Sequence, residues 1–335
     1  MRFFICILVL IVLIGCFGCH SNAVTEKYQN ERNRIVDVKD RVKAFDAEEV
    51  LIGGFAQPYL LGNYLLIADH KSLDKLVHVF DSQTLCYITS CVNRGEGPEE
   101  VLNMGCLGID ETRRIFYVSD HAKLKIFSYP IDSMLANSFY VHQVKAEMNA
   151  NQFPSEYQYI NDTLCIGRVI CPIGVNDYRP CVAKWNMLTG EIIPYTYEYP
   201  NMPKKRATCA ASIENNIYVE CYSKYDLMTI CSLDGQLKCN VYGPNWEKES
   251  KDNTYFGMPI ICKDKILVPY SGGKTRSDEY YPTKVLIFDV DGEYFQTLNI
   301  GYKINNFCYD KYNDQLILNF NDDIQLATLS MDGII

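Results

Sequence analysis

The residues best suited to chemistry lie in one glycine-rich stretch, CVNRGEGPEEVLNMG, at positions 91–105. Such a stretch could cradle a phosphate or present a cluster of carboxylates. A phosphate-binding loop requires a lysine after its last glycine, and a dinucleotide-binding loop requires a third glycine before a helix. This stretch has neither feature and carries Glu96, Glu99 and Glu100 instead. The sequence therefore argues against nucleotide binding.

Two interpretations of this stretch stay open. Arg94, Glu96, Glu99 and Glu100 are candidate ligand-binding residues if the loop faces a partner. Alternatively, the loop orders the junction between two structural units, and we favour this interpretation. The glycines permit backbone angles that are closed to other residues. Pro98 followed by two glutamates is typical of the first turn of a short helix.

Motifs for catalysis are scarce. The sequence contains no G-x-S-x-G or H-E-x-x-H motif. The pairs Asp69-His70 and Asp120-His121 occupy the same place in two similar segments, which a recurring turn explains better than a metal site does. The cysteines lack zinc-ligand spacing and mostly lie in apolar runs. We therefore expect no metal and no cofactor, and an enzyme is the less favoured class.

An internal repeat reveals the elements that position these residues. Six similar strand ends, each followed by a turn, recur along the chain: HVFDSQT, KIFSYPIDS, AKWNMLTG, TICSLDG, LIFDVDG and ATLSMDG. Successive repeats lie 42–58 residues apart when anchored at Phe80, Phe127, Trp185, Ser232, Phe288 and Ser330. Such a period, with four short strands per unit, is typical of a β-propeller. The sequence predicts an all-β fold, a six-bladed β-propeller with four-stranded blades.

The last repeat lacks a strand. Only INNFCYD, QLILNF and IQLATLS follow Ile300 as clear strands. Because an open sheet edge promotes aggregation, we expect an N-terminal strand to close the ring. The segment IVDVKDR or the segment near Val50 could supply it.

The RGEGPEE loop resembles the G-x-G-P-[GE]-E loop of the TolB-like six-bladed propeller lipoproteins of Gram-negative bacteria. The matching residues are Gly95, Gly97, Pro98, Glu99 and Glu100. The resemblance extends over the whole repeat region in architecture, but over this loop alone in motif. It implies a six-bladed propeller and, for function, the binding of proteins or saccharides at the cell envelope.

The N-terminus has the pattern of a bacterial lipoprotein signal. A basic residue at position 2 precedes an apolar run over 3–14, which is too short to span a bilayer but suits a signal peptide. The stretch LIGC at 13–16 resembles a lipobox and predicts lipid attachment at Cys16, with Cys19 as the alternative. We expect a signal peptide at 1–15, a lipidated cysteine and flexible tether at 16–34, and the propeller at 35–335. The expected location is the outer membrane, on its periplasmic side.

Composition narrows the possible partners. Hydrophobic residues make up 48% of the 335 residues, so the chain can bury a large core. A net charge of −9 argues against a nucleic-acid partner, which would need a basic face. We expect a monomer that contacts the membrane only through its lipid.

Two segments between predicted strands are much longer than the others, at 167–185 and 269–288. Long irregular insertions in a compact fold often carry function. In a propeller both would emerge on the same face as the RGEGPEE loop, although they could instead only cover strand ends. They add candidate ligand-binding residues, namely Arg168, Arg179, Lys274, Arg276 and Tyr281.

The favoured function is a binding or scaffold module for an unknown protein or saccharide partner. The alternative is a metal-dependent hydrolase or lyase with its site at the propeller axis. A ring of acids and asparagines at the axis would favour the enzyme, whereas an apolar or tyrosine-lined funnel would favour binding.

Overall fold

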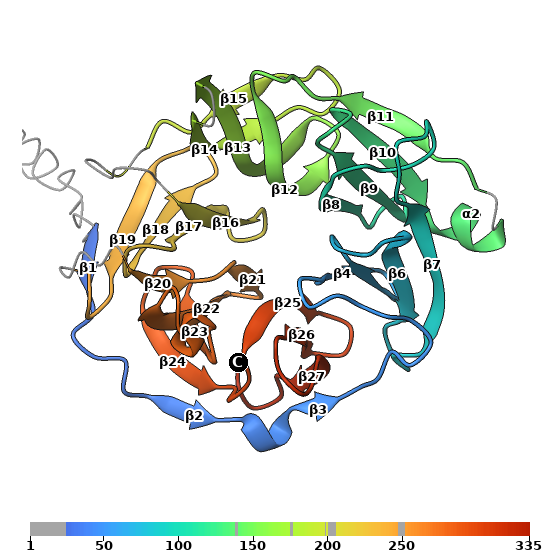
Figure 1. Ribbon diagram of the computed structural model, residues 1–335. Coiled ribbons are helices and arrows are strands. Elements are labelled where there is room, and N and C mark those ends of the chain that lie inside the picture. Colours follow the sequence, from blue (N-terminus) through green and yellow to red (C-terminus); the bar gives the residue numbers. More distant parts are fainter. Residues whose placement is uncertain (1–24, 138–139, 175–176, 198, 200–205, 247–251) are drawn as a thin grey trace, which may run out of the picture.

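Six β-sheets surround a central axis as the blades of a propeller (Figure 1). The computed structural model describes residues 25–335, apart from 138–139, 175–176, 198, 200–205 and 247–251. Each blade has an innermost strand A, followed outward by strands B, C and D. The predicted all-β, six-bladed propeller with four-stranded blades is confirmed.

The first three blades follow one another along the chain. Blade 1 contains β4 (Gln57–Leu61), β5 (Tyr64–Ala68), β6 (Lys75–Asp81) and β7 (Tyr87–Asn93). Blade 2 contains β8 (Met104–Asp110), β9 (Ile115–Asp120), β10 (Lys125–Pro130) and β11 (Gln143–Glu147), with helix α2 (Ile131–Ala136) before β11. Blade 3 contains β12 (Phe153–Asn161), β13 (Leu164–Gly174), β14 (Asp177–Trp185) and β15 (Ile192–Pro194).

The other three blades complete the ring. Blade 4 contains β16 (Ala207–Ser212), β17 (Ile217–Tyr222), β18 (Leu227–Ser232) and β19 (Leu237–Tyr242). In blade 5, β20 (Asn253–Phe256) and β21 (Ile260–Cys262) both pair with β22 (Lys265–Lys274), followed by β23 (Lys284–Asp289) and β24 (Tyr294–Asn299). Blade 6 contains β25 (Ile304–Asp310), β26 (Gln315–Phe320) and β27 (Leu326–Ser330).

The repeat seen in the sequence marks one structural position. All six anchors lie on strand C of successive blades, from Phe80 on β6 to Ser330 on β27. The register between strands C and D shifts beside Phe80, Phe127 and Phe288, where a β-bulge interrupts the ladder. The sequence repeat therefore marks strand C of every blade, and in three blades it coincides with this irregularity.

Buried apolar side chains fill the interfaces between neighbouring blades. Strands B and C are apolar on both faces, because each blade packs between two neighbouring blades, one on each side. Leu66 of blade 1, for example, packs in one cluster with Phe116 of blade 2. Leu65 of blade 1 shares another cluster with Ile317 of blade 6, so hydrophobic packing closes the ring.

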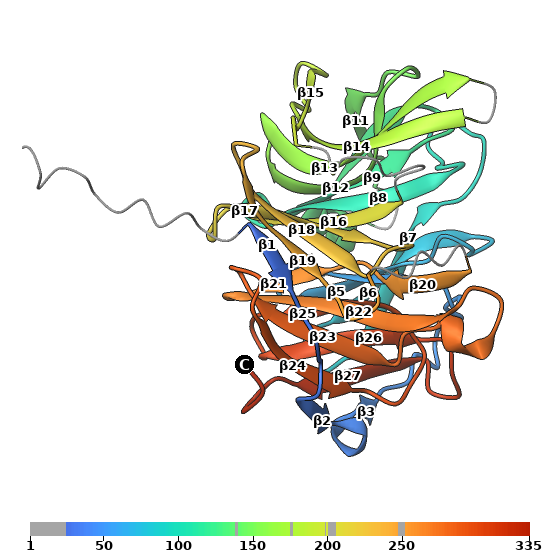
Figure 2. The same ribbon diagram turned by 90° about the vertical axis from the view of Figure 1, so that its left-hand side faces the viewer.

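The N-terminal segment wraps around the outside of three blades (Figures 1 and 2). Strand β1 (Glu26–Tyr28) pairs in parallel with β19, and β2 (Ile35–Asp37) pairs in parallel with β24. After the 3-10 helix η1 (Lys39–Arg41), β3 (Lys43–Ala44) pairs with β27 and becomes strand D of blade 6. Closure by an N-terminal strand is thus confirmed, although neither expected segment provides it.

This arrangement corrects two details of the sequence prediction. IVDVKDR contributes β2, which extends blade 5, and the segment near Val50 connects β3 to β4. Part of the expected tether, 16–34, is structured, since β1 pairs with β19 and the Arg32 side chain is buried. The predicted signal peptide and Cys16 lie outside the described residues.

The strand connections define two faces of the ring. The D-to-A and B-to-C connections emerge on one side, here called the connection face, and the A-to-B and C-to-D turns emerge on the opposite turn face. Among the described helices, none has the length and hydrophobicity needed to cross a bilayer. The molecule therefore offers three places for recognition: its two faces and its axis.

Candidate functional site

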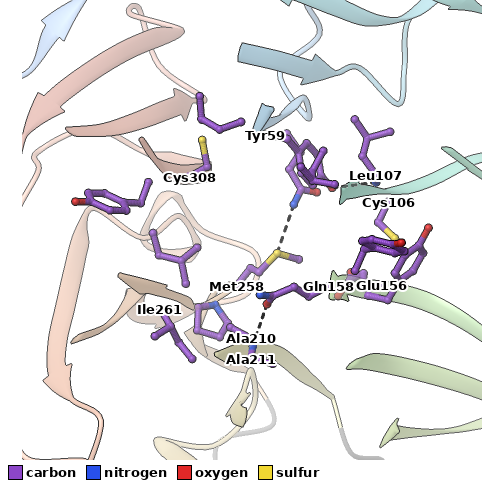
Figure 3. A pocket seen from close by; sticks show the side chains of 18 of the residues that line it. Tyr59, Cys106, Leu107, Glu156, Gln158, Ala210, Ala211, Met258, Ile261 and Cys308 are labelled. Carbon is purple, nitrogen blue, oxygen red and sulfur yellow. Dashed lines mark hydrogen bonds between the residues drawn. The ribbon is translucent and has the colours of Figure 1, made fainter. Parts of the chain in front are cut away.

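A cavity of about 400 Å³ lies on the propeller axis (Figure 3). Residues of the innermost strands of blades 1, 2, 3, 4 and 6 line it, and blade 5 adds β21 with the segment between β20 and β21. Tyr59, Gln158 and Met258 extend into this space from blades 1, 3 and 5. The volume lies within the range of about 300–1,000 Å³ that is usual for small-molecule sites.

The cavity wall is mainly apolar and aromatic, with few polar groups. Its charged members are Glu111 and Glu156, and it includes no Asp, Asn, His, Ser or Thr. Across the part of the chain that the structure describes, no three His, Cys, Asp or Glu side chains are placed to hold a metal ion. The wall is thus lined mainly by tyrosines and aliphatic side chains.

Glu156 is held by a neighbouring arginine on one side only. The register places Glu156 of β12 opposite Arg168 of β13. Arg168 Nη2 donates to Glu156 Oε1 at 2.8 Å, and its other nitrogens donate to Ser155 Oγ and to the Ala207 carbonyl, both at 3.1 Å. Glu156 Oε2 is buried without a hydrogen-bond partner. The carboxylate is therefore only partly hydrogen-bonded, with its second oxygen buried.

An ion pair joins two blades at the turn face. Lys311 and Glu111 form it between the A-to-B turns of blades 6 and 2, which are not neighbours in the ring. The hydrogen bond to Glu111 raises the pKa of Lys311 above its usual value. Because Glu111 also lines the cavity, this pair stands where the axial space meets the turn face.

Three cysteines line the cavity from alternate blades, namely Cys106, Cys209 and Cys308. Burial raises the pKa of Cys106 to about 12, and burial places the pKa of Cys308 well above its usual value. Nucleophilic chemistry requires a thiolate. Cys106 and Cys308 therefore remain neutral thiols at physiological pH and act as small apolar groups.

Two side-chain amides of the wall, those of Gln57 and Gln158, make few hydrogen bonds. Gln158 Oε1 accepts from the Ala211 amide at 3.2 Å, and Gln57 Nε2 contacts Met258 Sδ at 3.5 Å (Figure 3). Gln57, Gln158 and Glu156 were not among the residues predicted from the sequence. The only signal was polar residues at alternating positions, Glu156 and Gln158, within the strand FPSEYQYIN.

Hydrogen bonds within the RGEGPEE loop and to neighbouring turns hold the loop in place. Glu100 Oε2 accepts from the Gly97 amide at 2.8 Å, and a Cβ on Gly95 would lie 2.0 Å from that carboxylate. Lys123 Nζ donates to the carbonyls of Gly97 and Glu100. Arg94 donates to the Ser72 carbonyl at 2.8 Å. These contacts are those of a loop that orders the junction of blades 1 and 2.

The RGEGPEE loop lacks the predicted helical turn and exposes two of its glutamates. Residues 98–99 form a turn rather than the first turn of a helix. The Glu96 and Glu99 side chains are exposed on the connection face. A role for them in ligand binding therefore stays a prediction.

The two long insertions have different structures. The first continues the sheet as a hairpin of β13 and β14, and the expected irregular loop there is wrong. Arg168 belongs to this hairpin and contacts Glu156, so it is not at the rim. Arg179 lies nearer the tip with its side chain exposed.

Of the second insertion, 269–288, the ends belong to β22 and β23, and only 275–283 is a loop, which carries the 3-10 helix η2 (Asp278–Tyr280). Lys274, at the end of β22, and Arg276, in the loop, are exposed. The Tyr281 ring contacts the Tyr280 ring edge-on, with centroids 5.4 Å apart. The structure thus brings the candidates Arg179, Lys274, Arg276 and Tyr281 to the connection face but leaves their role as a prediction.

Four exposed apolar side chains, here called the blade 1 patch, lie in connections on the connection face around blade 1. They are Leu51 and Phe55 before β4, Leu73 between β5 and β6, and Leu102 between β7 and β8, of which Leu51 and Leu73 are 94% and 92% exposed. These residues were not predicted, because single apolar residues in loops give no signal in the sequence.

Comparisons with known proteins agree with the fold. A family model described as a 6-bladed beta-propeller matches residues 46–162, which comprise blades 1 and 2 and the whole of strand A of blade 3. No curated protein matches the sequence. The match supports a six-bladed propeller family over that part of the chain.

Solved structures extend the likeness over most of the chain. A Bacteroides vulgatus protein from a family of unknown function is 11% identical with a TM-score of 0.57, over 86% of this chain and 95% of its own. A Bacteroides fragilis protein inferred to be exported is 12% identical with a TM-score of 0.54, over 91% and 98%. A gluconolactonase of Xanthomonas campestris is 12% identical with a TM-score of 0.54, over 87% and 95%. At these identities the likeness shows the propeller fold alone.

Proposed function

We propose that the protein is a lipid-anchored, TolB-like propeller of the cell envelope that binds a protein partner through its connection face at blade 1. A six-bladed propeller of this kind is compatible with a binding or scaffold module. The observation that carries the proposal is the blade 1 patch, because exposed apolar side chains gathered on one surface of a soluble domain commonly mark an interaction site.

Hydrogen bonds hold the patch in a fixed geometry. The amide of Gly53, between Leu51 and Phe55, donates to Asp69 Oδ2 at 2.7 Å. Asp69 begins the turn that carries Leu73, and Arg94 donates to Ser72 within that turn. A surface ordered in this way loses little conformational entropy when a partner docks.

Exposed acidic side chains lie near the patch in sequence and on the same face, namely Asp46, Glu48, Glu49, Asp74, Glu96 and Glu99. Lys71 is an exposed basic residue of the same region. This distribution favours a partner segment that is apolar at its centre and basic at its edges. A saccharide, which would need aromatic platforms and neutral donors, fits this patch less well.

A paired substitution tests the docking surface. Leu51→Asp with Leu73→Asp should reduce capture of the partner from envelope extracts at least tenfold. Leu188→Asp is the matched control, because Leu188 is 60% exposed on the turn face of blade 3. Both variants should keep the melting temperature of the wild type, since exposed positions contribute little to stability.

The proposal fails if the double variant retains the same partner as the control. Replacing Arg179, Arg276 and Tyr281 by Ala shows whether recognition extends to blades 3 and 5. Binding lost only in this triple variant would move the docking surface away from blade 1. A glycan retained by wild type and double variant alike would identify a saccharide module instead.

The envelope anchor is tested separately. Because LIGC at 13–16 fits a lipobox, Cys16→Ala should abolish labelling by an alkyne fatty acid and release the protein from membranes. Unchanged labelling of this variant would exclude Cys16 and point to Cys19. Protease treatment of intact cells then distinguishes a periplasmic protein, which stays protected, from one on the cell surface.

A further inference from the structure

Ion pairs balance the charges at the axial cavity. Its two charged lining residues are Glu111 and Glu156. Lys311 pairs with Glu111, and Arg168 pairs with Glu156 at 2.8 Å. A charged ligand would lose its hydration in this space without an unpaired opposite charge to compensate for the loss, which is unfavourable. The cavity therefore favours an uncharged ligand.

Two side-chain amides of the wall supply hydrogen-bonding atoms for such a ligand. Gln158 is exposed although it stands on the innermost strand β12, and Gln57 of β4 is half-buried. The Ala211 amide fixes Gln158 Oε1 as an acceptor, so the Nε2 group of Gln158 remains a donor. Among the described residues, no group bonds to Gln158 Nε2 or to Gln57 Oε1, and Gln57 Oε1 is not buried. The wall thus presents a free donor and a free acceptor.

The two amides serve the same space. Gln57 Nε2 contacts Met258 Sδ at 3.5 Å, and Gln158 and Met258 both extend into the cavity (Figure 3). A hydrocarbon that filled this space would leave both amides without partners, which is unfavourable. A carboxamide carries the complementary N–H donor and carbonyl acceptor. The wall therefore matches an amide better than a purely apolar molecule.

The rest of the wall offers apolar surface to the body of a ligand. Half-buried side chains form much of it, including those of Tyr59, Leu60, Met258, Ile261 and Tyr309. The two tyrosine hydroxyls are already bound, because Tyr59 accepts from the Leu107 amide at 3.4 Å and Tyr309 donates to Asp314 at 2.6 Å. A cavity of about 150 Å³ holds a benzene molecule. The volume of about 400 Å³ therefore admits a body of one or two rings.

We propose that the axial cavity binds a small uncharged molecule that joins a carboxamide to an aromatic body of one or two rings. The carboxamide N–H donates to Gln57 Oε1, and its carbonyl accepts from Gln158 Nε2. The rings pack against Met258 and the tyrosines of the wall. This site is distinct from the docking surface at blade 1, so either proposal can fail without the other.

Isothermal titration calorimetry of the full chain in detergent tests the proposal, with titration into protein-free micelles subtracted. The probes are benzamide, 2-naphthamide and indole-3-carboxamide, each with its matched carboxylate and its matched arylmethylamine. At least one carboxamide should bind at least tenfold more tightly than both charged counterparts, because neither charge meets an unpaired partner in the wall. The proposal is wrong if no carboxamide binds, or if a charged counterpart binds as tightly.

Substitutions identify the amides that hold the ligand. Gln158→Leu and Gln57→Leu each remove one hydrogen-bonding amide at similar size, and each should weaken carboxamide binding at least tenfold. Gln236→Leu, at an exposed residue of a turn in blade 4, is the matched control and should leave binding unchanged. The melting temperature of each variant shows whether it is folded. Carboxamide binding that neither cavity variant weakens would overturn the proposal.

A spectroscopic probe places the bound ligand. In a spectrum of 13C-methyl methionine, the Met258 signal, assigned through Met258→Leu, should shift when the carboxamide is added. At the same concentration the shift should be smaller in Gln158→Leu. A Met258 signal that stays in place while the carboxamide binds would exclude the axial cavity.

Discussion

Two arginine–carboxylate pairs in this propeller differ in how completely the carboxylate is hydrogen-bonded. At the interface of blades 4 and 5, Arg32 Nη1 donates to Asp226 Oδ1 at 2.9 Å, and the two side chains are 7% and 0% exposed. Asp226 Oδ2 accepts from Tyr270 at 3.0 Å and from the Asn245 amide at 3.3 Å. Near the axis, Glu156 has one oxygen bound by Arg168 and one without a partner.

The difference indicates that the Arg32–Asp226 pair contributes more to stability than the Arg168–Glu156 pair. Every oxygen of Asp226 is occupied, and the Arg32 guanidinium also lies 5.0 Å from the centre of the Tyr270 ring. This pair fastens the N-terminal segment to the ring, with both carboxylate oxygens bound, although Arg32 Nη2 is buried without a hydrogen-bond partner. The pair at Glu156 is more exposed, at 30% for Glu156 and 26% for Arg168, and one carboxylate oxygen has no hydrogen-bond partner.

The largest effect should come from removing the N-terminal segment. A chain that begins at residue 46 lacks β1, β2, β3 and Arg32, so blade 6 has an open edge and Asp226 is buried without its cation. We expect a loss of several kcal/mol, comparable with the whole stability of a domain at about 5–15 kcal/mol. Thermal unfolding should show a melting temperature lowered by more than 10 °C, or an aggregated protein.

The matched control is a chain that begins at residue 25 and retains β1, β2 and β3. It should melt at the same temperature as the full chain. If the two truncated chains have the same melting temperature, the N-terminal segment does not stabilise the ring. The Arg32–Asp226 pair would then not be needed for stability.

The sequence predicted the propeller because the repeat is local. The repeated motif falls on strand C of every blade. The turns at Asp69 and Asp120 recur because each carboxylate accepts backbone amides of its own turn and of the incoming connection. Such patterns lie within a few dozen residues of one another. Closure by an N-terminal strand followed from counting the strands of the last repeat.

The candidate site could not be predicted in the same way. Arg32 and Asp226 are 194 residues apart, and a single sequence gives no sign that they meet. The sequence predicted a loop at Arg168, because the strand β13 is longer than usual. The ion pair of Arg168 with Glu156 could therefore not be predicted. The cavity itself depends on which residues of six separate strands turn inward, which only the closed ring determines.

Side-by-side measurement of the unfolding free energies of Arg32→Ala and Glu156→Gln tests the central claim most directly. Removing one partner of a buried pair costs about 3–5 kcal/mol, so Arg32→Ala should lower the free energy of unfolding by that amount. Glu156→Gln keeps the shape of the side chain and an acceptor for the partly exposed Arg168, so its loss should stay below about 1 kcal/mol. Equal losses in the two variants would contradict the claim, because Glu156 would then hold the fold as Asp226 does.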